Sequence, residues 1–271
     1  MGFSWKMGRV AGIDLFLHPT FLVLLAWTYA SEGANFTLFM TAIFGCVMLH
    51  EFGHALAARA LGIPTRSITL YFFGGIARLE RMPRAPGAEL LITLAGPLVN
   101  VAIGLALALG FWVEGVLSPG AGPTALTQFA SNLMLVNFLL AAFNMVPAFP
   151  MDGGRILRAL LTVKIGRARA TEIAAKVGQV IAVVFGAYSI ASATKGDGIP
   201  WSQVLLAAFI YYAAGVELSQ SRDDEEQRRG GSGDGVWTAP PGYRWVQQGQ
   251  GFWQLAPIHV HAASWDHRSW R

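Results

Sequence analysis

Long apolar segments separated by short polar ones form the main pattern along this chain of 271 residues. About 20 apolar residues are enough for a helix to cross the roughly 30 Å hydrocarbon core of a bilayer. The first apolar segment is short for that task, and the others are long enough. We therefore expect an all-α polytopic membrane protein with about six transmembrane helices, at residues 19–30, 35–61, 87–113, 125–146, 168–193 and 201–218.

Composition supports this expectation and excludes other classes. Hydrophobic residues make up 54% of the chain, and charged residues only 13%, about half the charged fraction of a soluble domain. The single cysteine, Cys46, excludes an internal disulfide. The net charge of +4 does not come from a basic face with interleaved aromatic residues, so we expect a lipid bilayer as partner and no nucleic acid.

Residues 67–79 follow a different pattern from the predicted helices. They are rich in β-branched and aromatic residues and are interrupted by Gly74 and Gly75, which predicts a small membrane-associated β-hairpin or sheet. An unpaired strand edge there would accept an extended peptide, with Phe73, Gly74 and Gly75 as candidate substrate-binding residues. The alternative is an interfacial loop that packs its aromatic side chains at headgroup depth. Trp5 and the turn at residues 16–19 are expected to form an interfacial edge that leads into the first helix.

Three ionisable residues interrupt the second apolar segment. His50 and His54 are four residues apart, so on a helix they lie on one face and can bind one Zn²⁺ ion. Glu51 lies beside them and is free to take a proton from water that the ion activates. In a soluble helix this motif often occurs by chance on a solvated face. Inside an apolar segment each such group costs about 2.5–3.5 kcal/mol, which favours a metal site typical of metalloproteases.

A second polar group of residues ends the fourth apolar segment. Asn144 is followed by Pro147, Pro150 and Asp152, and a Gly pair then permits a tight turn. The second and fourth segments run in the same direction across the bilayer, so Asp152 emerges on the same side as the two histidines and is a candidate third ligand. The alternative is that Asp152 caps a helix that begins at Gly153, a role worth about 1 kcal/mol.

Taken together, four motifs resemble the site-2 protease family of intramembrane zinc metalloproteases, in a compact form without PDZ or CBS domains. They are HEFGH at residues 50–54, the Gly pair at 74–75, AGPLVN at 95–100 and NMVPAFPMDGGR at 144–155. The resemblance implies one Zn²⁺ held by His50, His54 and Asp152, with Glu51 as general base and acid. It also implies that Asn144 binds substrate or the developing oxyanion.

The same resemblance implies a reaction and a class of substrate. The reaction is hydrolysis of a peptide bond within or near the transmembrane segment of a membrane protein, as in regulated intramembrane proteolysis. An anti-sigma factor, a membrane-tethered regulator or a leftover signal peptide would be the partner. Two alternatives are a polytopic metal or ion transporter and a catalytically inactive membrane scaffold. The presence of Glu51 argues against both.

The chain is expected to divide into three parts. Residues 1–220 would form the intramembrane metalloprotease core, residues 221–235 a flexible linker, and residues 236–271 a small cytoplasmic tail. The tail holds five of the nine tryptophans, and two apolar stretches flank a Gln- and Gly-rich segment. This arrangement predicts a hairpin.

The distribution of basic residues predicts the orientation in the cell membrane. Residues 1–18, 59–86 and 148–169 hold twelve Lys and Arg, whereas residues 31–36, 114–124 and 194–200 hold one. By the positive-inside rule, both termini and the loops with Arg78 and Arg158 are cytoplasmic. A periplasmic phosphatase reporter fused after Leu218 should therefore be inactive, and an active reporter there would contradict the topology.

Overall fold

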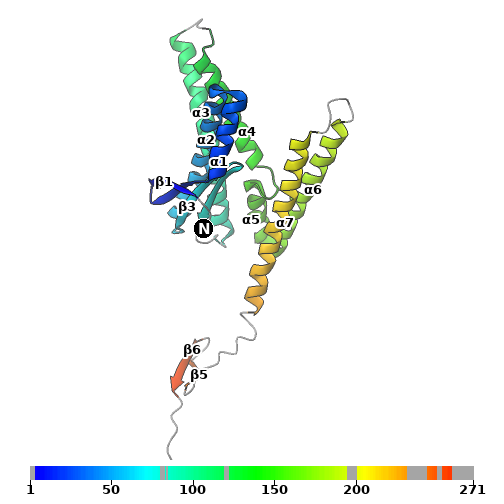
Figure 1. Ribbon diagram of the computed structural model, residues 1–271. Helices are drawn as coiled ribbons and strands as arrows, with labels where there is room; N and C mark the ends of the chain where they lie inside the picture. Colours follow the sequence, from blue (N-terminus) through cyan, green and yellow to red (C-terminus); the bar gives the residue numbers. More distant parts are fainter. Residues whose placement is uncertain are drawn as a thin grey trace, which may run out of the picture. The chain divides into compact units, whose positions relative to one another are not determined.

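The computed structural model describes residues 4–79, 83, 85–118, 122–193, 200–230, 243–248 and 252–257. The chain divides into two compact units, Met1–Ser221 and Arg222–Arg271. Helices dominate the first unit, and a small sheet lies beside one end of them (Figure 1). In the second unit, β5 (Tyr243–Gln248) and β6 (Phe252–Pro257) pair antiparallel. Residues 221–230 of the expected flexible linker are helical instead, as the end of α7 (Trp201–Gly230). The remaining linker and tail residues, 231–242, 249–251 and 258–271, lie outside the described residues.

The helices of the first unit confirm a polytopic membrane protein. Among the described residues, five helices are long and apolar enough to cross a bilayer. The first expected segment forms α1 (Pro19–Glu32), whose 14 residues extend only about 21 Å, so the expected six become five helices of spanning length and one shorter helix. The five are α2 (Ala34–Ala60), α3 (Pro86–Leu117), α4 (Ala125–Asn144), α6 (Arg167–Ala193) and α7 (Trp201–Gly230).

Local sequence signals define where α1 and α4 begin. The side chain of His18 accepts a hydrogen bond from the backbone N–H of Thr20, and Pro19 occupies the first turn of α1, where a missing N–H costs nothing. Thr124 and Thr127 form a reciprocal capping box at the start of α4. These caps satisfy backbone N–H groups that lipid could not satisfy.

The spanning helices turn apolar side chains outward and polar ones inward. On α3, Leu98, Leu105 and Trp112 are exposed, whereas Glu89 and Asn100 are buried. Lipid is as apolar as leucine, so burial of leucine does not drive these helices together, and contact depends on close packing and polar pairs. Gly53 of α2 makes such packing possible, because a Cβ there would lie 2.6 Å from the carbonyl oxygen of Ala95 on α3.

A four-stranded sheet in the described part of the first unit confirms the expected β structure. Its order is β1-β2-β3-β4. β3 (Thr65–Tyr71) and β4 (Gly74–Leu79) are the expected hairpin, and they pair antiparallel. The inner face packs on α2 through Ile13, Ile68 and Ala55. β4 is an edge strand of this sheet, and it lines the same cavity as His50, His54 and Asp152.

Two strands that the sequence pattern did not predict lie before α1. Residues in this stretch form β1 (Trp5–Val10) and β2 (Ile13–Leu17), joined by a two-residue turn in which Ala11 and Gly12 both have positive φ. β2 pairs parallel with β3, although α1 and α2 lie between these two strands in the sequence. An irregular register between Lys6 and Gly8 interrupts the alternation of side chains that would have revealed β1.

A network of ion pairs connects the second turn of α5 (Asp152–Ile165) with three other helices, α3, α6 and α7. Arg158 of α5 donates from Nε to Glu89 of α3 at 2.8 Å and from Nη1 to Glu217 of α7 at 2.7 Å. Arg167, at the start of α6, donates to the second Glu89 oxygen at 2.9 Å. Glu89 and Arg158 are both buried. The network therefore ties α5, which carries Asp152, to the neighbouring helices.

Substitution of Glu89 by alanine should destabilise the protein strongly. It leaves the buried Arg158 guanidinium without its main acceptor, and breaking a buried pair costs about 3–5 kcal/mol. The thermal unfolding temperature of purified Glu89→Ala in detergent should therefore fall clearly. The control is Lys176→Ala, which removes an exposed pair with Glu172 worth about 0–1 kcal/mol. Equal unfolding temperatures for the two variants would contradict a stabilising role of the network.

Candidate metal centre

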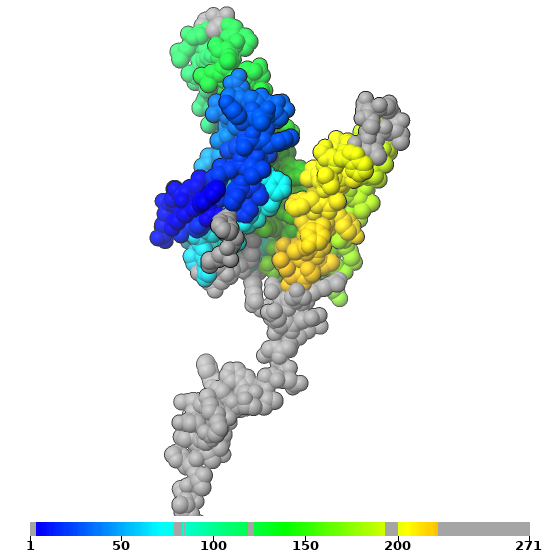
Figure 2. All heavy atoms as spheres, viewed as in Figure 1, coloured from blue at the N-terminus to red at the C-terminus, as the bar shows by residue number. Residues whose placement is uncertain are grey.

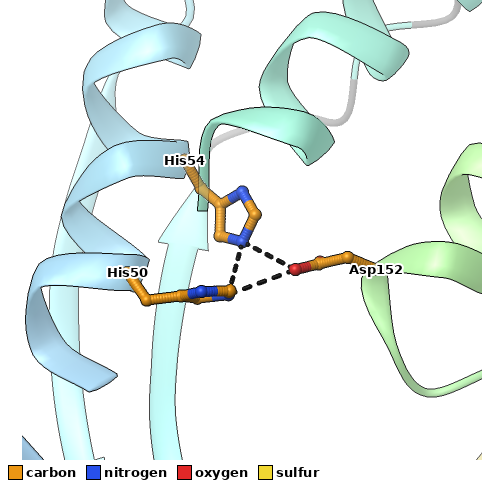
Figure 3. A group of neighbouring side chains, drawn as sticks. All are labelled: His50, His54 and Asp152. Atoms are coloured by element: carbon orange, nitrogen blue, oxygen red, sulfur yellow. Dashed lines mark hydrogen bonds and ion pairs between the residues drawn. The ribbon is translucent and has the colours of Figure 1, made fainter. Parts of the chain in front are cut away.

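Three buried side chains from two helices converge on one point (Figure 3). His50 and His54 lie one turn apart on α2, and Asp152 lies in the first turn of α5. Asp152 Oδ2 is 3.1 Å from His50 Nε2 and 3.2 Å from His54 Nε2. The two Nε2 atoms are 3.1 Å apart. The three atoms thus form a nearly equilateral triangle.

The size of this triangle fits a zinc ion. With zinc–ligand bonds of about 2.0–2.1 Å, the ligand atoms of a tetrahedral site lie about 3.3–3.4 Å apart. The observed edges of 3.1–3.2 Å are close to that value. Two imidazole nitrogens and one carboxylate oxygen also form one of the donor sets of catalytic zinc sites. The residues present therefore fit the metal, and no change of fold is needed to bring them together.

The contacts of Nδ1, the other ring nitrogen of each histidine, indicate which nitrogen carries the proton. His54 Nδ1 lies 2.8 Å from the backbone carbonyl oxygen of Ile92, and His50 Nδ1 lies 2.6 Å from Asn100 Oδ1. Both oxygens are acceptors, so each Nδ1 donates its proton and each Nε2 presents a lone pair. Three electron-rich atoms then face one another. A metal cation between them would relieve their repulsion, and this arrangement therefore fits a metal site.

Asp152 is not the cap of a helix, which was the alternative interpretation. Met151 is the N-cap of α5, and no side chain makes a capping hydrogen bond there. Asp152 lies in the first turn of α5 instead, and its Oδ2 faces the Nε2 atoms of His50 and His54. Gly153 makes this position possible, because a Cβ there would lie 2.1 Å from the carbonyl oxygen of Val146.

Glycine 96 is equally necessary on the other side of the histidines. A Cβ at Gly96 would lie 2.2 Å from His54 Nε2 and 2.7 Å from His50 Nε2. The backbone of α3 therefore packs directly against the two metal-facing nitrogens. Sequence reasoning singled out the AGPLVN motif but did not predict this contact, because the motif does not say which helix its glycine faces.

Glu51 lies beside the triangle but does not belong to it. Among the described residues, the group that could hold a metal ion comprises His50, His54 and Asp152. Glu51 lines the same cavity, next to the β4 strand, where a Cβ on Gly75 would lie 2.7 Å from Glu51 Cγ. Cys46, which precedes His50 by one turn, accepts a hydrogen bond from Asn137 Nδ2 at 3.3 Å instead of joining the triangle.

A cavity of about 460 Å³ is lined by Glu51 and by the three ligand candidates His50, His54 and Asp152. It lies between the part of the chain drawn in blue to green and the yellow helix α7, with the cyan β3–β4 segment at its edge (Figure 2). The candidate substrate-binding residues Phe73, Gly74, Gly75 and Asn144 line it together with Glu51 and the three ligand candidates. The structure therefore brings together every site residue that the sequence analysis named.

Three comparisons with known proteins agree with this geometry. The model of peptidase family M50 matches residues 38–119 and 113–185. A zinc metalloprotease of Methanocaldococcus jannaschii is 34% identical over 221 residues, which are 80% of this chain and 61% of that protein. Rip3 of Mycobacterium tuberculosis, whose name is putative zinc metalloprotease Rip3, is 31% identical over 78% of this chain and 57% of its own length. The chain thus spans about three fifths of these relatives.

A solved structure shows the same architecture. The site-2 protease from Methanocaldococcus jannaschii superposes with a TM-score of 0.58 at 32% sequence identity, over 80% of this chain and 95% of that chain. The family match covers more than half of the sequence and includes the helix with His50 and His54 as well as Asp152. The chain therefore belongs to peptidase family M50 and has the fold of a site-2 protease.

Proposed function

We propose that this protein is a zinc metalloendopeptidase that hydrolyses a peptide bond within or near the transmembrane segment of a membrane protein. The observation that carries the proposal is that one cavity holds both a possible zinc site and a carboxylate that can transfer protons. Three side chains that fit zinc converge there, and a carboxylate that is not among them lies alongside. This cavity lies among helices long and apolar enough to span a membrane. Membership of peptidase family M50 supports the proposal.

His50, His54 and Asp152 would hold the zinc ion through Nε2, Nε2 and Oδ2. Zinc bound there supplies Lewis-acid chemistry, by lowering the pKa of water and polarising the scissile carbonyl. The histidines hold the correct nitrogen toward the metal because their Nδ1 protons are already donated to Asn100 and Ile92. Asp152 adds a negative charge, which strengthens the site relative to a neutral ligand.

Glu51 would move the protons of the reaction. It follows His50 directly, so on α2 its side chain points about 100° away from the ligand face and toward the cavity. Its carboxylate oxygen takes a proton from the attacking water. The same oxygen then delivers that proton to the nitrogen of the leaving amine, so that the enzyme returns to its starting state.

The edge of β4 would hold the substrate. A peptide bond inside a helix has its carbonyl hydrogen-bonded, so the substrate must unwind locally before water can attack. In the described sheet β4 pairs on one side, with β3, and its other side offers backbone groups to an extended peptide. Gly74 and Gly75 leave room for that peptide beside Glu51, and the exposed ring of Phe73 would contact its side chains.

Asn144 would assist at the reacting carbonyl. Its Nδ2 donates one hydrogen to the carbonyl oxygen of Leu140 at 3.0 Å, on its own helix. An amide nitrogen carries two hydrogens, so one N–H remains for the oxygen that becomes negative as water attacks. The bond to Leu140 holds the amide at the wall of the cavity.

The setting of the proposed reaction is the cytoplasmic membrane, with both termini in the cytoplasm, as the charge distribution predicts. The substrate class is a membrane protein whose helix contains small or helix-breaking residues near the cleavage point, because these reduce the cost of unwinding. An anti-sigma factor, a membrane-tethered regulator or a leftover signal peptide would satisfy this description.

Asp152→Asn should give a folded, zinc-poor and inactive protein. Asparagine keeps the size of the side chain but replaces an anionic ligand by a weaker neutral one. Zinc content by elemental analysis, circular dichroism and cleavage of a transmembrane peptide measure the three properties. Full zinc occupancy together with normal turnover would exclude Asp152 as a ligand.

Glu51→Gln should separate metal binding from catalysis. The variant should keep one zinc per chain and lose cleavage by a factor of at least about 100, since proton transfer by a positioned group contributes about 10²- to 10⁴-fold. Glu172→Gln, which changes an exposed carboxylate on α6, is the control and should cleave normally. Near-normal proteolysis by Glu51→Gln, or zinc flux through wild-type proteoliposomes without cleavage, would contradict the proposed function.

A further inference from the structure

A chain of buried hydrogen bonds leads away from His50 across three helices. His50 Nδ1 on α2 lies 2.6 Å from Oδ1 of Asn100 on α3. Asn100 Nδ2 donates to Oδ1 of Asn137 on α4 at 3.0 Å. Asn137 Nδ2 donates to the backbone carbonyl oxygen of Leu133 at 2.9 Å and to Cys46 Sγ at 3.3 Å. Both asparagine side chains are completely buried, at 0% exposure.

The last acceptor in this series, the carbonyl oxygen of Leu133, determines the direction of every hydrogen bond back to His50. The carbonyl oxygen of Leu133 can only accept, so Asn137 must turn its NH₂ toward it and its Oδ1 toward Asn100. Asn100 must then present its NH₂ to Asn137 and its Oδ1 to His50. An oxygen beside His50 Nδ1 requires that this nitrogen carries the proton. The lone pair of the imidazole is therefore on Nε2, the atom that faces Asp152.

His54 achieves the same result in a simpler way. Its Nδ1 donates directly to the carbonyl oxygen of Ile92 at 2.8 Å, and a backbone carbonyl in a helix cannot reverse its direction. The partner of His50 is a side-chain amide, which can turn over and exchange its oxygen for NH₂. If Asn100 turned over, its NH₂ would face His50 Nδ1 and would favour the tautomer that carries the proton on Nε2. In that tautomer Nε2 has no free lone pair, so it cannot bind a metal ion. Asn137 is placed to prevent this.

We propose that Asn100 and Asn137 are positioning residues for the metal site, which select the tautomer of His50 that binds zinc. Asn100 acts on His50 directly, and Asn137 acts only through Asn100. The inference rests on the proposed function, because it assumes that His50 is a zinc ligand. It goes beyond that function by assigning to α4, which carries none of the three ligand candidates, a defined role in metal affinity.

The first test compares two substitutions of Asn100. Asn100→Leu removes the acceptor and should weaken Zn²⁺ affinity by about 10- to 100-fold, the usual effect of losing a partner behind a metal-binding histidine. Asn100→Asp keeps an oxygen toward His50 Nδ1, so it should bind Zn²⁺ within about threefold of wild type, since carboxylates commonly support such histidines. It should nevertheless be less stable, because Asn137 then faces an oxygen in place of NH₂.

The second test asks whether Asn137 acts on His50 only through Asn100. Asn137→Leu should also weaken Zn²⁺ affinity, and the double variant Asn100→Leu/Asn137→Leu should bind no more weakly than Asn100→Leu alone. Effects that pass through one residue are not additive, whereas two independent structural effects would add. Ser189→Ala is the matched control. Ser189 is also completely buried and donates to the carbonyl oxygen of Phe185 at 2.8 Å, so its loss should lower stability without changing Zn²⁺ affinity.

The measurements are made on the purified full chain in detergent. Zn²⁺ affinity is determined by competition with a chelator, the visible spectrum of the Co²⁺-substituted protein reports on ligand geometry, and thermal unfolding of the metal-free protein gives stability. We expect altered Co²⁺ bands for Asn100→Leu and wild-type bands for Asn100→Asp. Unchanged Zn²⁺ affinity in Asn100→Leu, or additive losses in the double variant, would overturn the inference while the wild type still binds zinc and cleaves. A wild type that binds no Zn²⁺ would overturn the proposed function as well.

Discussion

Polar groups among apolar helices need partners inside the protein, because lipid provides none, and this constraint governs the whole structure. His54, His50 and Glu89 each have such a partner. His54 uses a backbone carbonyl of α3, His50 uses Asn100, and Glu89 binds two arginines. Glycine allows the helices to approach closely enough for these contacts, most clearly at Gly96 against both histidines. At the candidate metal site the Nδ1 protons of both histidines are donated elsewhere, and a metal cation would balance the three atoms that converge there.

Most of the fold could be predicted from the sequence because the signal was strong and local. Long apolar runs identify α2, α3, α4, α6 and α7, since each run alone satisfies the length of a bilayer. The N-terminal strands β1 and β2 were not predicted. Their signal is weak because β1 is short and irregular in register, and β2 finds its partner β3 about 50 residues further along the chain. Such pairing depends on α1 and α2 folding between them, which no local pattern records.

The candidate site could be predicted to a similar extent, for a similar reason. His50, Glu51 and His54 share one helix turn, and proline and glycine around Asp152 indicate a constrained loop. Asn100 entered the sequence analysis only as the last residue of the AGPLVN motif. Its contact with His50 depends on how α3 is rotated against α2, and the further contact with Asn137 depends on α4. Spacing along one helix predicts which residues share a face, but it does not predict which residue of another helix they meet.

X-ray absorption at the zinc edge of the purified protein is the most direct test that His50, His54 and Asp152 hold the metal. If these three residues hold the metal, we expect two imidazole ligands with zinc–nitrogen distances of about 2.0–2.1 Å, oxygen ligands at a similar distance, and no sulfur. Cys46 is the only cysteine of the chain. A zinc–sulfur distance of about 2.3 Å, or a spectrum without the scattering of imidazole rings, would contradict the site described above.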